Sequence, residues 1–432
     1  MTKFKFLSIL ALLCITASSA WADVQPTGSV TTYKGCKNAI YVDGTASDAD
    51  VPGQSISVDV YVKQSGSTIK TLRLTTIAST GRFAGFVSGL AAGNYDVTVY
   101  ALNNSGSNNP DIGTQSDVMV ISTNDTQPTG ALNDCTGGNG SVHFRGWSFD
   151  YDDPAWSPRV YIYYRTHGSS GDYTELGYFD TTIERADVNE DYGLTGNHGF
   201  EGYLPVAAGT YDFRIYFQNN SGSNNSSVTQ ENITVSAPNS TYNVPAHSAS
   251  EAYWATFYCI GGNYQAAEGT QVFTVKLEGT EIKMNEVSDR IAKSGQGVVL
   301  KKTTTGNFTM TLTETAPAGD FSSNNLDGTM TQINTTGAND YYVLGGKNGA
   351  GFYKLSNTSG TIGANKAYLT YSGGGGAGAR EFFLFDEATG IEIPTVEDVN
   401  ADAVVYDLQG RRVVNPTKGL YIVNGKKVFI NK

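Results

Sequence analysis

The sequence predicts an all-β protein: two tandem immunoglobulin- or fibronectin III-like sandwiches, a further antiparallel β-domain and a short C-terminal β meander. Apolar and polar residues alternate along many short runs, and no long segment shows the 3.6-residue apolar period of a helix. Charged residues make up only 16% of the 432 residues. A stretch of about 100 residues is repeated, which indicates a duplicated domain, because solenoid units are about 20–50 residues long.

Residues 1–22 have the features of a secretory signal peptide. Lys3 and Lys5 precede the mostly apolar run Phe6–Ala17, and A-W-A at Ala20–Ala22 offers the small residues that a signal peptidase needs. No later run approaches the roughly 20 apolar residues of a membrane-spanning helix. We therefore expect an exported mature chain from Asp23, secreted or at the outer cell surface, without membrane insertion.

The net charge limits the possible binding partners, and the cysteine content limits the possible disulfide bonds. The formal net charge is −12, and an acidic body is a poor partner for nucleic acid or anionic lipid. Cys36, Cys135 and Cys259 follow the signal, an odd number at wide spacing that does not form a disulfide framework. A Cys36–Cys135 bridge stays open, because the two residues occupy similar places in the repeat, but free thiols are the favoured interpretation.

The two sandwiches are predicted at residues 23–124 and 125–238, each with a core of its own. At an offset of 102, V-D-V-Y-V from Val58 aligns with V-Y-I-Y-Y from Val160. Each copy has about seven strand-like runs with turn signals between them. The second copy is longer, which we assign to longer loops.

The phrase N-N-S-G-S-N-N at Asn103–Asn109 returns at Asn219–Asn225. Both copies follow a strand-like alternation that begins A-A-G-x-Y, which resembles the tyrosine corner of immunoglobulin-like and fibronectin III folds. Asn, Gly and Ser tolerate the positive φ angles of a tight reversal, so the phrase is predicted as the hairpin after that strand, at equivalent ends of the sandwiches. The inward faces of the two strands are predicted to be Tyr95, Val97, Val99 and Ala101, and Tyr211, Phe213, Ile215 and Phe217.

The second copy carries three further motifs. Gly146 begins G-W-S-F-D-Y-D-D-P, Arg185 begins R-A-D-V and Gly196 begins G-N-H-G-F. They resemble a repeat common in secreted bacterial proteins, including cell-wall hydrolases, which reads G-W-x-x-D-x-D-x-P, R-x-D-V and N-H-G-F. The resemblance covers residues 140–225 and implies an accessory module. The first copy lacks the Trp and the last two motifs.

Residues 239–390 are predicted as the β-domain, because alternation continues but the repeat stops. G-Q-G-V-V-L-K from Gly295, N-L-D-G-T from Asn325 and G-F-Y-K-L from Gly351 resemble a β-domain of Bacteroidales surface proteins. That domain typically lies just before the C-terminus, as it does in this sequence.

The tail, residues 391–432, contains V-V-Y-D-L-Q-G-R-R from Val404 and a second Gly-containing turn near Gly425. It resembles the C-terminal sorting domain that the type IX (Por) secretion system of Bacteroidetes recognises. This implies export through that machinery, with exposed basic side chains on three short strands. The alternative is a last hairpin of the preceding domain. The residues that carry the resemblance to the sorting domain are Tyr406, Asp407, Gly410, Arg411, Gly419, Tyr421, Gly425 and Lys427.

The sequence contains no catalytic motif. None of the four histidines belongs to H-E-x-x-H or another spaced ligand pair, and there is no G-x-S-x-G, C-x-x-C or Walker loop. We therefore predict no catalytic residue and no enzyme activity. A hydrolase with its active site in residues 239–390 is an alternative.

Acidic loops recur before a Pro-containing turn, with Asp48 and Asp50 in the first copy and Asp150 and Asp152 in the second. Ca²⁺ takes carboxylate oxygens, and Asp187 would complete such a site in the second copy only. The favoured interpretation is an Asx turn, because no EF-hand spacing accompanies these residues. No cofactor or metal is expected, and Asp150, Asp152 and Asp187 are weak Ca²⁺ candidates.

Aromatic residues gather in the second copy, and exposed rings stack on sugars while Asn and Asp bind the hydroxyl groups. Trp147 is predicted in the core and Trp156 in an exposed loop. The predicted function is binding or adhesion to an extracellular glycan or another surface polymer. A structural spacer is the alternative. The candidate ligand-binding residues are Trp156, Tyr173, Asn219 and Asn220.

Overall fold

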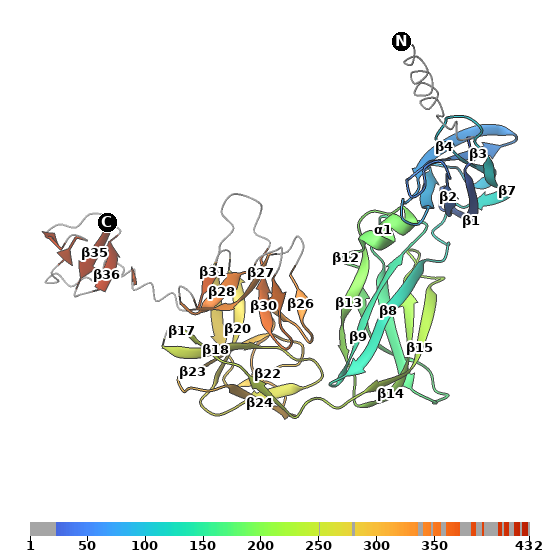
Figure 1. Ribbon diagram of the computed structural model, residues 1–432. Coiled ribbons are helices and arrows are strands. Elements are labelled where there is room, and N and C mark those ends of the chain that lie inside the picture. Colours follow the sequence, from blue (N-terminus) through green and yellow to red (C-terminus); the bar gives the residue numbers. More distant parts are fainter. Residues whose placement is uncertain are drawn as a thin grey trace, which may run out of the picture. The chain divides into compact units, whose positions relative to one another are not determined.

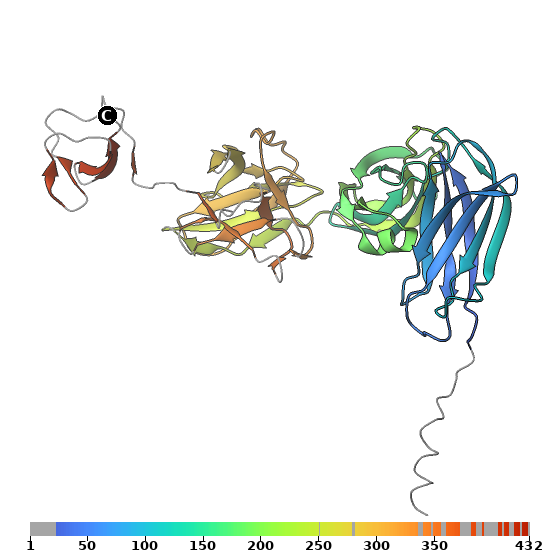
Figure 2. The same cartoon turned by 90° about the horizontal axis from the view of Figure 1, so that it is seen from above.

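The computed structural model is all-β with one short helix among the residues it describes. The chain divides into two compact units (Figures 1 and 2). The N-terminal unit is Met1–Thr136, His143–Leu204 and Gly209–Thr234, and the C-terminal unit is Gly137–Val142, Pro205–Ala208 and Val235–Lys432. The predicted signal peptide lies outside the described residues, which are 23–249, 251–278, 281–335, 340–346, 349–355, 360–371, 382–385, 391–392, 405–407, 410–413, 419–423 and 426–430.

The first sandwich has seven strands in two antiparallel sheets. One sheet has the strand order β1-β2-β5 and the other β4-β3-β6-β7. The strands are β1 (Thr27–Cys36), β2 (Ala39–Ser47), β3 (Ser57–Gln64), β4 (Ser67–Thr75), β5 (Arg82–Ser88), β6 (Gly93–Ala101) and β7 (Asp111–Val120).

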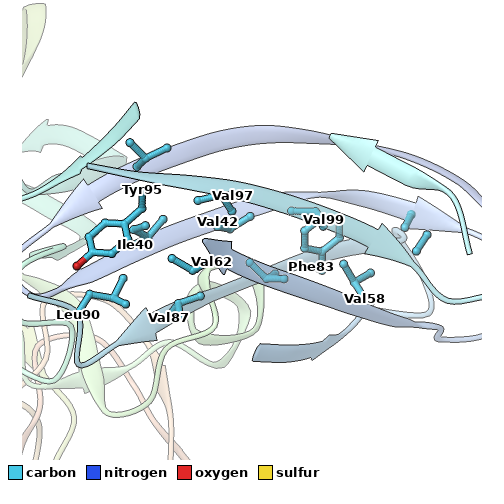
Figure 3. Packing of buried hydrophobic residues seen from close by; sticks show 14 of the residues in the cluster. Ile40, Val42, Val58, Val62, Phe83, Val87, Leu90, Tyr95, Val97 and Val99 are labelled. Carbon is cyan, nitrogen blue, oxygen red and sulfur yellow. The ribbon is translucent and has the colours of Figure 1, made fainter. Parts of the chain in front are cut away.

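Alternate side chains of these strands fill the space between the two sheets. Val58 and Val62 of β3 are fully buried, whereas the residues at odd positions between them are partly exposed, as the two-residue period of a strand requires. They belong to one cluster with Val42 of β2, Phe83 of β5 and Val99 of β6 (Figure 3). The first sandwich therefore has the core that alternation predicts.

The A-A-G-N-Y phrase at the start of β6 forms the expected tyrosine corner. The hydroxyl of Tyr95 donates to the carbonyl oxygen of Ala91 at 2.8 Å. Tyr95 is buried together with Val97, Val99 and Ala101. The inward face predicted for this strand is confirmed.

The second sandwich repeats the first with two four-stranded sheets, β12-β13-β9-β8 and β11-β10-β14-β15. Three of its strands begin 102 residues after their counterparts, as the predicted offset requires. Phe213, Ile215 and Phe217 of β14 are buried, while Tyr211 is half-buried. The strands are β8 (Thr129–Gly138), β9 (Ser141–Phe149), β10 (Arg159–Thr166), β11 (Thr174–Asp180), β12 (Ile183–Glu184), β13 (Asn197–Pro205), β14 (Gly209–Phe217) and β15 (Ser226–Val235).

The second copy is longer because of a segment that forms β12 and helix α1 (Ala186–Tyr192). The sequence predicted only longer loops there, because seven residues are too few to show a 3.6-residue period. The helix ends at Gly193, which takes the left-handed φ of +65° that glycine permits. Within the described part of the chain, no helix is long and apolar enough to cross a membrane.

A second hydrophobic cluster joins the two sandwiches. Tyr41 of β2 is fully buried, and its ring centre lies 5.1 Å from that of Tyr151 in the second sandwich. Phe149 and Val188 of the second sandwich belong to the same cluster, as does Cys36 of the first. The first sandwich has the core of its own that was predicted, and this shared cluster is an additional one that was not predicted. All four residues from Ala39 to Val42 are buried, so the start of β2 is covered on both faces, which strand alternation alone does not reveal.

The three described cysteines are free thiols, as predicted. Cys36 lies in the cluster between the sandwiches, and burial raises the pKa of its thiol to about 12. Burial also raises the pKa of Cys135 to about 12. Neither thiol is therefore a reactive thiolate near neutral pH.

Before the tail, the described residues of the C-terminal unit form the sheets β16-β24-β19-β22, β17-β18-β23-β20-β21, β25-β30-β27-β28-β31 and β26-β29. Phe257, Tyr264, Leu300 and Phe308 are among the residues of its core. The strands are β16 (Thr241–Val244), β17 (His247–Ala249), β18 (Ala252–Phe257), β19 (Asn263–Ala266), β20 (Gln271–Glu278), β21 (Glu281–Glu286), β22 (Ile291–Ala292), β23 (Val298–Lys302), β24 (Phe308–Thr313), β25 (Leu326–Gly328), β26 (Ile333–Asn334), β27 (Tyr341–Gly345), β28 (Gly351–Lys354), β29 (Thr361–Ile362), β30 (Ala367–Thr370) and β31 (Phe382–Leu384).

The tail forms one sheet with the strand order β32-β36-β35-β33-β34. It is not a simple meander, because β33 pairs with β34 on one side and with β35 on the other. At the first turn, the Asp407 carboxylate accepts the backbone N–H and the Nε–H of Arg411, at 2.8 and 2.7 Å. Gly410 has a φ of +79° there, whereas Gly425 lies outside the described residues. The strands are β32 (Ile391–Glu392), β33 (Val405–Tyr406), β34 (Arg412–Val413), β35 (Gly419–Val423) and β36 (Lys426–Ile430).

Gly193→Ala should loosen the junction between the two sandwiches. A Cβ at this position would lie 2.5 Å from the carbonyl oxygen of Ala84 in β5, and the φ of +65° adds strain. We expect a loss of about 1–3 kcal/mol in the free energy of unfolding and faster protease cleavage of the connecting residues 121–128.

The matched control is Gly53→Ala, because Gly53 has a φ of +73° with no heavy atom within 4 Å of a Cβ. It carries the backbone strain without the contact to the other sandwich. Equal cleavage of residues 121–128 in the two variants would contradict the proposed role of Gly193.

Candidate functional site

The second N-N-S-G-S-N-N hairpin is held by a buried aspartate. Asp150 is fully buried, and its Oδ2 accepts the backbone N–H of Asn220 at 2.7 Å. Its Oδ1 accepts the backbone N–H of Asp152 at 2.8 Å. One carboxylate therefore connects the acidic loop after β9 with the hairpin between β14 and β15.

Asn219 closes the same hairpin from within. Its backbone N–H donates to Oδ1 of Asn225 at 2.8 Å, and its Oδ1 accepts the N–H of Ser221 at 2.8 Å. Its Nδ2 donates to the carbonyl oxygen of Thr126 at 2.8 Å. Asn219 is fully buried, so its amide is not at a ligand surface. The sequence suggested otherwise because polar letters do not distinguish an amide that builds a hairpin from an exposed one.

The first copy repeats this network. Asp48 Oδ2 accepts the N–H of Asn104 at 3.0 Å, and its Oδ1 accepts the N–H of Asp50 at 2.9 Å. The N–H of Asn103 donates to Oδ1 of Asn109 at 2.9 Å. The repeated phrase therefore encodes an aspartate-anchored hairpin in each sandwich.

The second aspartate of each acidic loop holds the start of its own sandwich. Asp50 Oδ2 accepts the N–H of Val24 at 2.9 Å, and Asp152 Oδ2 accepts the N–H of Thr126 at 2.7 Å. Asp152 Oδ1 also accepts the N–H of Lys37 in the first sandwich, at 2.6 Å. Asp152 thereby connects the two sandwiches through backbone hydrogen bonds.

The carboxylates that were predicted as weak calcium ligands accept hydrogen bonds from other groups of the protein. All four carboxylate oxygens of Asp150 and Asp152 accept backbone N–H groups. Burial raises the pKa of Asp150, although its two backbone hydrogen bonds act in the opposite direction. The hydrogen-bonded guanidinium of Arg185 lowers the pKa of Asp187 to about 2. Over the described residues no group of three or more His, Cys, Asp or Glu is arranged to hold a metal, and the contacts favour the Asx-turn interpretation.

The outward face of β10 and β14 carries tyrosines and arginines. In the register of the two strands, Tyr161 lies opposite Tyr216, and Tyr163 lies opposite Arg214. The rings of Tyr163 and Tyr216 meet edge to face, with centres 5.4 Å apart at 82°. Both strands bury their other set of side chains, so these residues face away from the core.

Tyr173, in the loop between β10 and β11, packs against two arginines of this face. The guanidinium carbons of Arg165 and Arg214 lie 4.5 and 4.4 Å from the centre of its ring, within the range of a cation–π interaction. A cavity of about 780 Å³ lies over the face. Its lining includes Tyr161, Tyr163, Arg165, Asp172, Tyr173, Arg214 and Tyr216, with Gly222 and Asn225 of the hairpin.

The two arginines differ in their counter-ions. The buried Asp212 pairs with Arg165 Nε at 3.4 Å and with His167 Nδ1 at 2.6 Å. Burial alone would raise the pKa of Asp212, but hydrogen bonds from His167 and from the N–H of Asn232 lower it below its usual value. Arg214 has no carboxylate partner within the described residues. The lining of the cavity therefore includes a guanidinium that forms no ion pair with a described residue, together with the exposed carboxylate of Asp172.

Of the four predicted ligand residues, Tyr173 alone is among the residues that line this cavity. Trp156 is half-buried in the loop between β9 and β10 rather than exposed. Asn220 is half-buried and donates through Nδ2 to Asp153 Oδ2 at 3.3 Å. Asn219 is buried.

Sequence reasoning missed Arg165, Arg214 and Tyr216. A usable signal was present, because Phe213 and Ile215 were predicted to face the core. The residues between and after them must then face outward. Reading both faces of the repeated strand would have identified this site.

The motifs that resemble the secreted bacterial repeat lie at or near the junction of the sandwiches. Trp147 is 9% exposed, as predicted for a core residue, and belongs to the shared cluster. Val188 of R-A-D-V is buried in the same cluster. His198 of N-H-G-F is fully buried with its ring 6.1 Å from Phe149, and burial lowers its pKa. These motifs have structural roles in the second sandwich.

No protein-family profile matches the chain, and no curated protein matches it in sequence. Among solved structures, a marsupial T cell receptor is similar at 10% identity and a TM-score of 0.18, over 67% of this chain and 96% of the receptor chain. A DUF3823 family protein from Bacteroides ovatus is similar at 10% identity and a TM-score of 0.17, over 49% of this chain and 98% of the other. No functional conclusion follows from these similarities.

Proposed function

We propose that this protein is a non-catalytic, secreted protein of the outer cell surface that binds an acidic polysaccharide on the outward face of β10 and β14. The observation that supports the proposal is the arrangement of Arg165 and Arg214 around Tyr173, beside the paired rings of Tyr163 and Tyr216. No cofactor takes part in this binding.

Each part of the face suits a different part of a uronic acid unit. Tyrosine rings pack against the apolar faces of pyranose rings. Asn225 lines the cavity, and because its Oδ1 accepts the N–H of Asn219, its NH₂ is the group left to bind hydroxyl groups. A guanidinium binds a carboxylate through two N–H groups, which gives both strength and orientation. A neutral glycan would leave Arg214 without a counter-ion, so an acidic unit is favoured.

A structural spacer is the second candidate. It is favoured by the hydrophobic cluster and the Asp152–Lys37 hydrogen bond, which hold the two sandwiches to each other. A spacer requires this stiffness but no positively charged aromatic face, so polysaccharide binding distinguishes the two functions.

The location part of the proposal is based on the signal-like residues 1–22 and the sorting-like tail. The exposed Arg411 and Arg412 of the tail are accessible to a receptor, and Asp407 fixes the turn that presents them. In this proposal the secretion machinery recognises the tail and carries the protein to the cell surface.

Tyr216→Ala should weaken binding of polygalacturonate about tenfold, because it removes one of the paired rings. A buried stacking contact of this kind is worth about 1–2 kcal/mol. The measurement is affinity electrophoresis in gels that contain polygalacturonate, with fully methyl-esterified pectin as the neutral comparison.

The control is Tyr203→Ala, a half-buried tyrosine in β13 of the other sheet of the same sandwich. It should leave the retardation in polygalacturonate unchanged. If the wild type is not retarded, or both variants bind like the wild type, the proposed site is wrong.

Deletion of residues 403–432 should retain the protein inside the cell envelope, because the signal that the secretion machinery recognises is removed. Both sandwiches should stay folded, since their strands end at Val235. Cell fractionation in the native host, compared with the full chain, measures this. Unchanged display at the surface would contradict a sorting role for the tail.

A further inference from the structure

The first sandwich carries a face that corresponds to the proposed binding face. A cavity of about 770 Å³ lies over β3 and β6, the strands equivalent to β10 and β14. Its lining includes Tyr61 and Lys63 of β3 and Tyr100 of β6. At the offset of 102, Tyr61 and Lys63 correspond to Tyr163 and Arg165; at the offset of 116 that separates the two N-N-S-G-S-N-N phrases, Tyr100 corresponds to Tyr216.

The two faces also agree in geometry. The rings of Tyr61 and Tyr100 meet edge to face with centres 5.5 Å apart at 89°, as do those of Tyr163 and Tyr216 at 5.4 Å and 82°. The hairpin supplies Gly106 and Asn109 to the edge of the cavity, where Gly222 and Asn225 lie in the second sandwich.

The first face has fewer cationic groups. The position equivalent to Arg214 is Thr98, which is buried. A tight turn at Ser65 and Gly66 replaces the loop that carries Tyr173. Arg73 is neutralised by Asp59 through two hydrogen bonds of 2.7 and 2.8 Å. Lys63 has no salt bridge within the described residues and remains the cation that could meet a carboxylate.

From this repetition we infer that the first sandwich has a second, weaker binding site for the same polysaccharide, built on Tyr61, Tyr100 and Lys63. The inference depends on the proposed function, because the ligand class is transferred from the second sandwich. The ligand at this second site is another stretch of the same polysaccharide molecule that Tyr163 and Tyr216 bind. Both faces offer the same kinds of contact: a pair of tyrosine rings, a basic residue at the same register position and an amide from the same hairpin.

The junction between the sandwiches allows two sites to bind one long polymer more tightly than a single site would. The shared cluster around Tyr41 and Phe149, together with the Asp152–Lys37 hydrogen bond, restricts movement of one face relative to the other. A second contact on a long polymer then forms at a high effective concentration, which raises avidity by roughly 10²–10⁴-fold when both sites can be reached at once. A short oligomer can occupy each site but cannot bridge them.

Titration calorimetry of the mature chain with trigalacturonate should give two molecules bound per chain, one more weakly. The double variant Tyr61→Ala, Tyr100→Ala should bind one molecule, and its affinity for polygalacturonate should fall at least tenfold. The matched variant Tyr61→Phe, Tyr100→Phe keeps both rings and should keep two sites. The double variant Tyr163→Ala, Tyr216→Ala should retain only the weaker site.

The possible outcomes separate this inference from the proposed function. One trigalacturonate per wild-type chain, lost in the Tyr163→Ala, Tyr216→Ala variant, would overturn the second site and leave the proposed function intact. Absence of binding to the wild type would overturn both. Should the Tyr61→Ala, Tyr100→Ala variant fail to fold, the wild-type stoichiometry and a Lys63→Ala variant decide, because Lys63 is on the outward face of β3.

Discussion

In each sandwich one buried carboxylate, Asp48 in the first and Asp150 in the second, holds the acidic loop and the N-N-S-G-S-N-N hairpin together. Removing a carboxylate from water is costly unless hydrogen bonds replace its hydration. Here backbone N–H groups of two separate loops do so. Hydrogen bonds to a charged group contribute about 1.5–3 kcal/mol each, so the acidic loop and the hairpin are held in one geometry by a single side chain.

This constraint connects the parts of the N-terminal unit. The hairpin held by Asp150 places Gly222 and Asn225 at the edge of the cavity. The neighbouring Asp152 holds the start of the second sandwich and the N–H of Lys37 in the first. The same acidic loop therefore shapes the proposed binding face and fixes the junction between the sandwiches, while the duplicated loop around Asp48 shapes the corresponding face.

Much of the fold could be predicted because it repeats and alternates. The offset of 102 located the first three strands of the second sandwich, and the period of two identified Tyr95 and Val97 as core. The site was harder, because Asn219 looks like a surface residue until its buried hydrogen bonds are seen. The junction was not predictable from alternation, since Tyr41 faces away from its own core and is buried by another sandwich. Such contacts depend on three-dimensional packing between repeats, which strand periodicity does not encode.

Hydrogen–deuterium exchange of the wild type and of Asp150→Asn, followed by mass spectrometry, tests the role of the buried carboxylate most directly. In the wild type both carboxylate oxygens of Asp150 accept backbone N–H groups. In the variant one of these oxygens is replaced by an NH₂ group, which cannot accept a hydrogen bond, and this costs about 1–3 kcal/mol. We expect peptides that cover residues 219–225 to exchange much faster in the variant, while β10 and the equivalent hairpin at residues 103–109 keep their protection. Asp172→Asn, at an exposed position of the same sandwich, should change neither hairpin. Unchanged exchange of residues 219–225 in Asp150→Asn would contradict the account, because the hairpin would then not depend on the buried carboxylate.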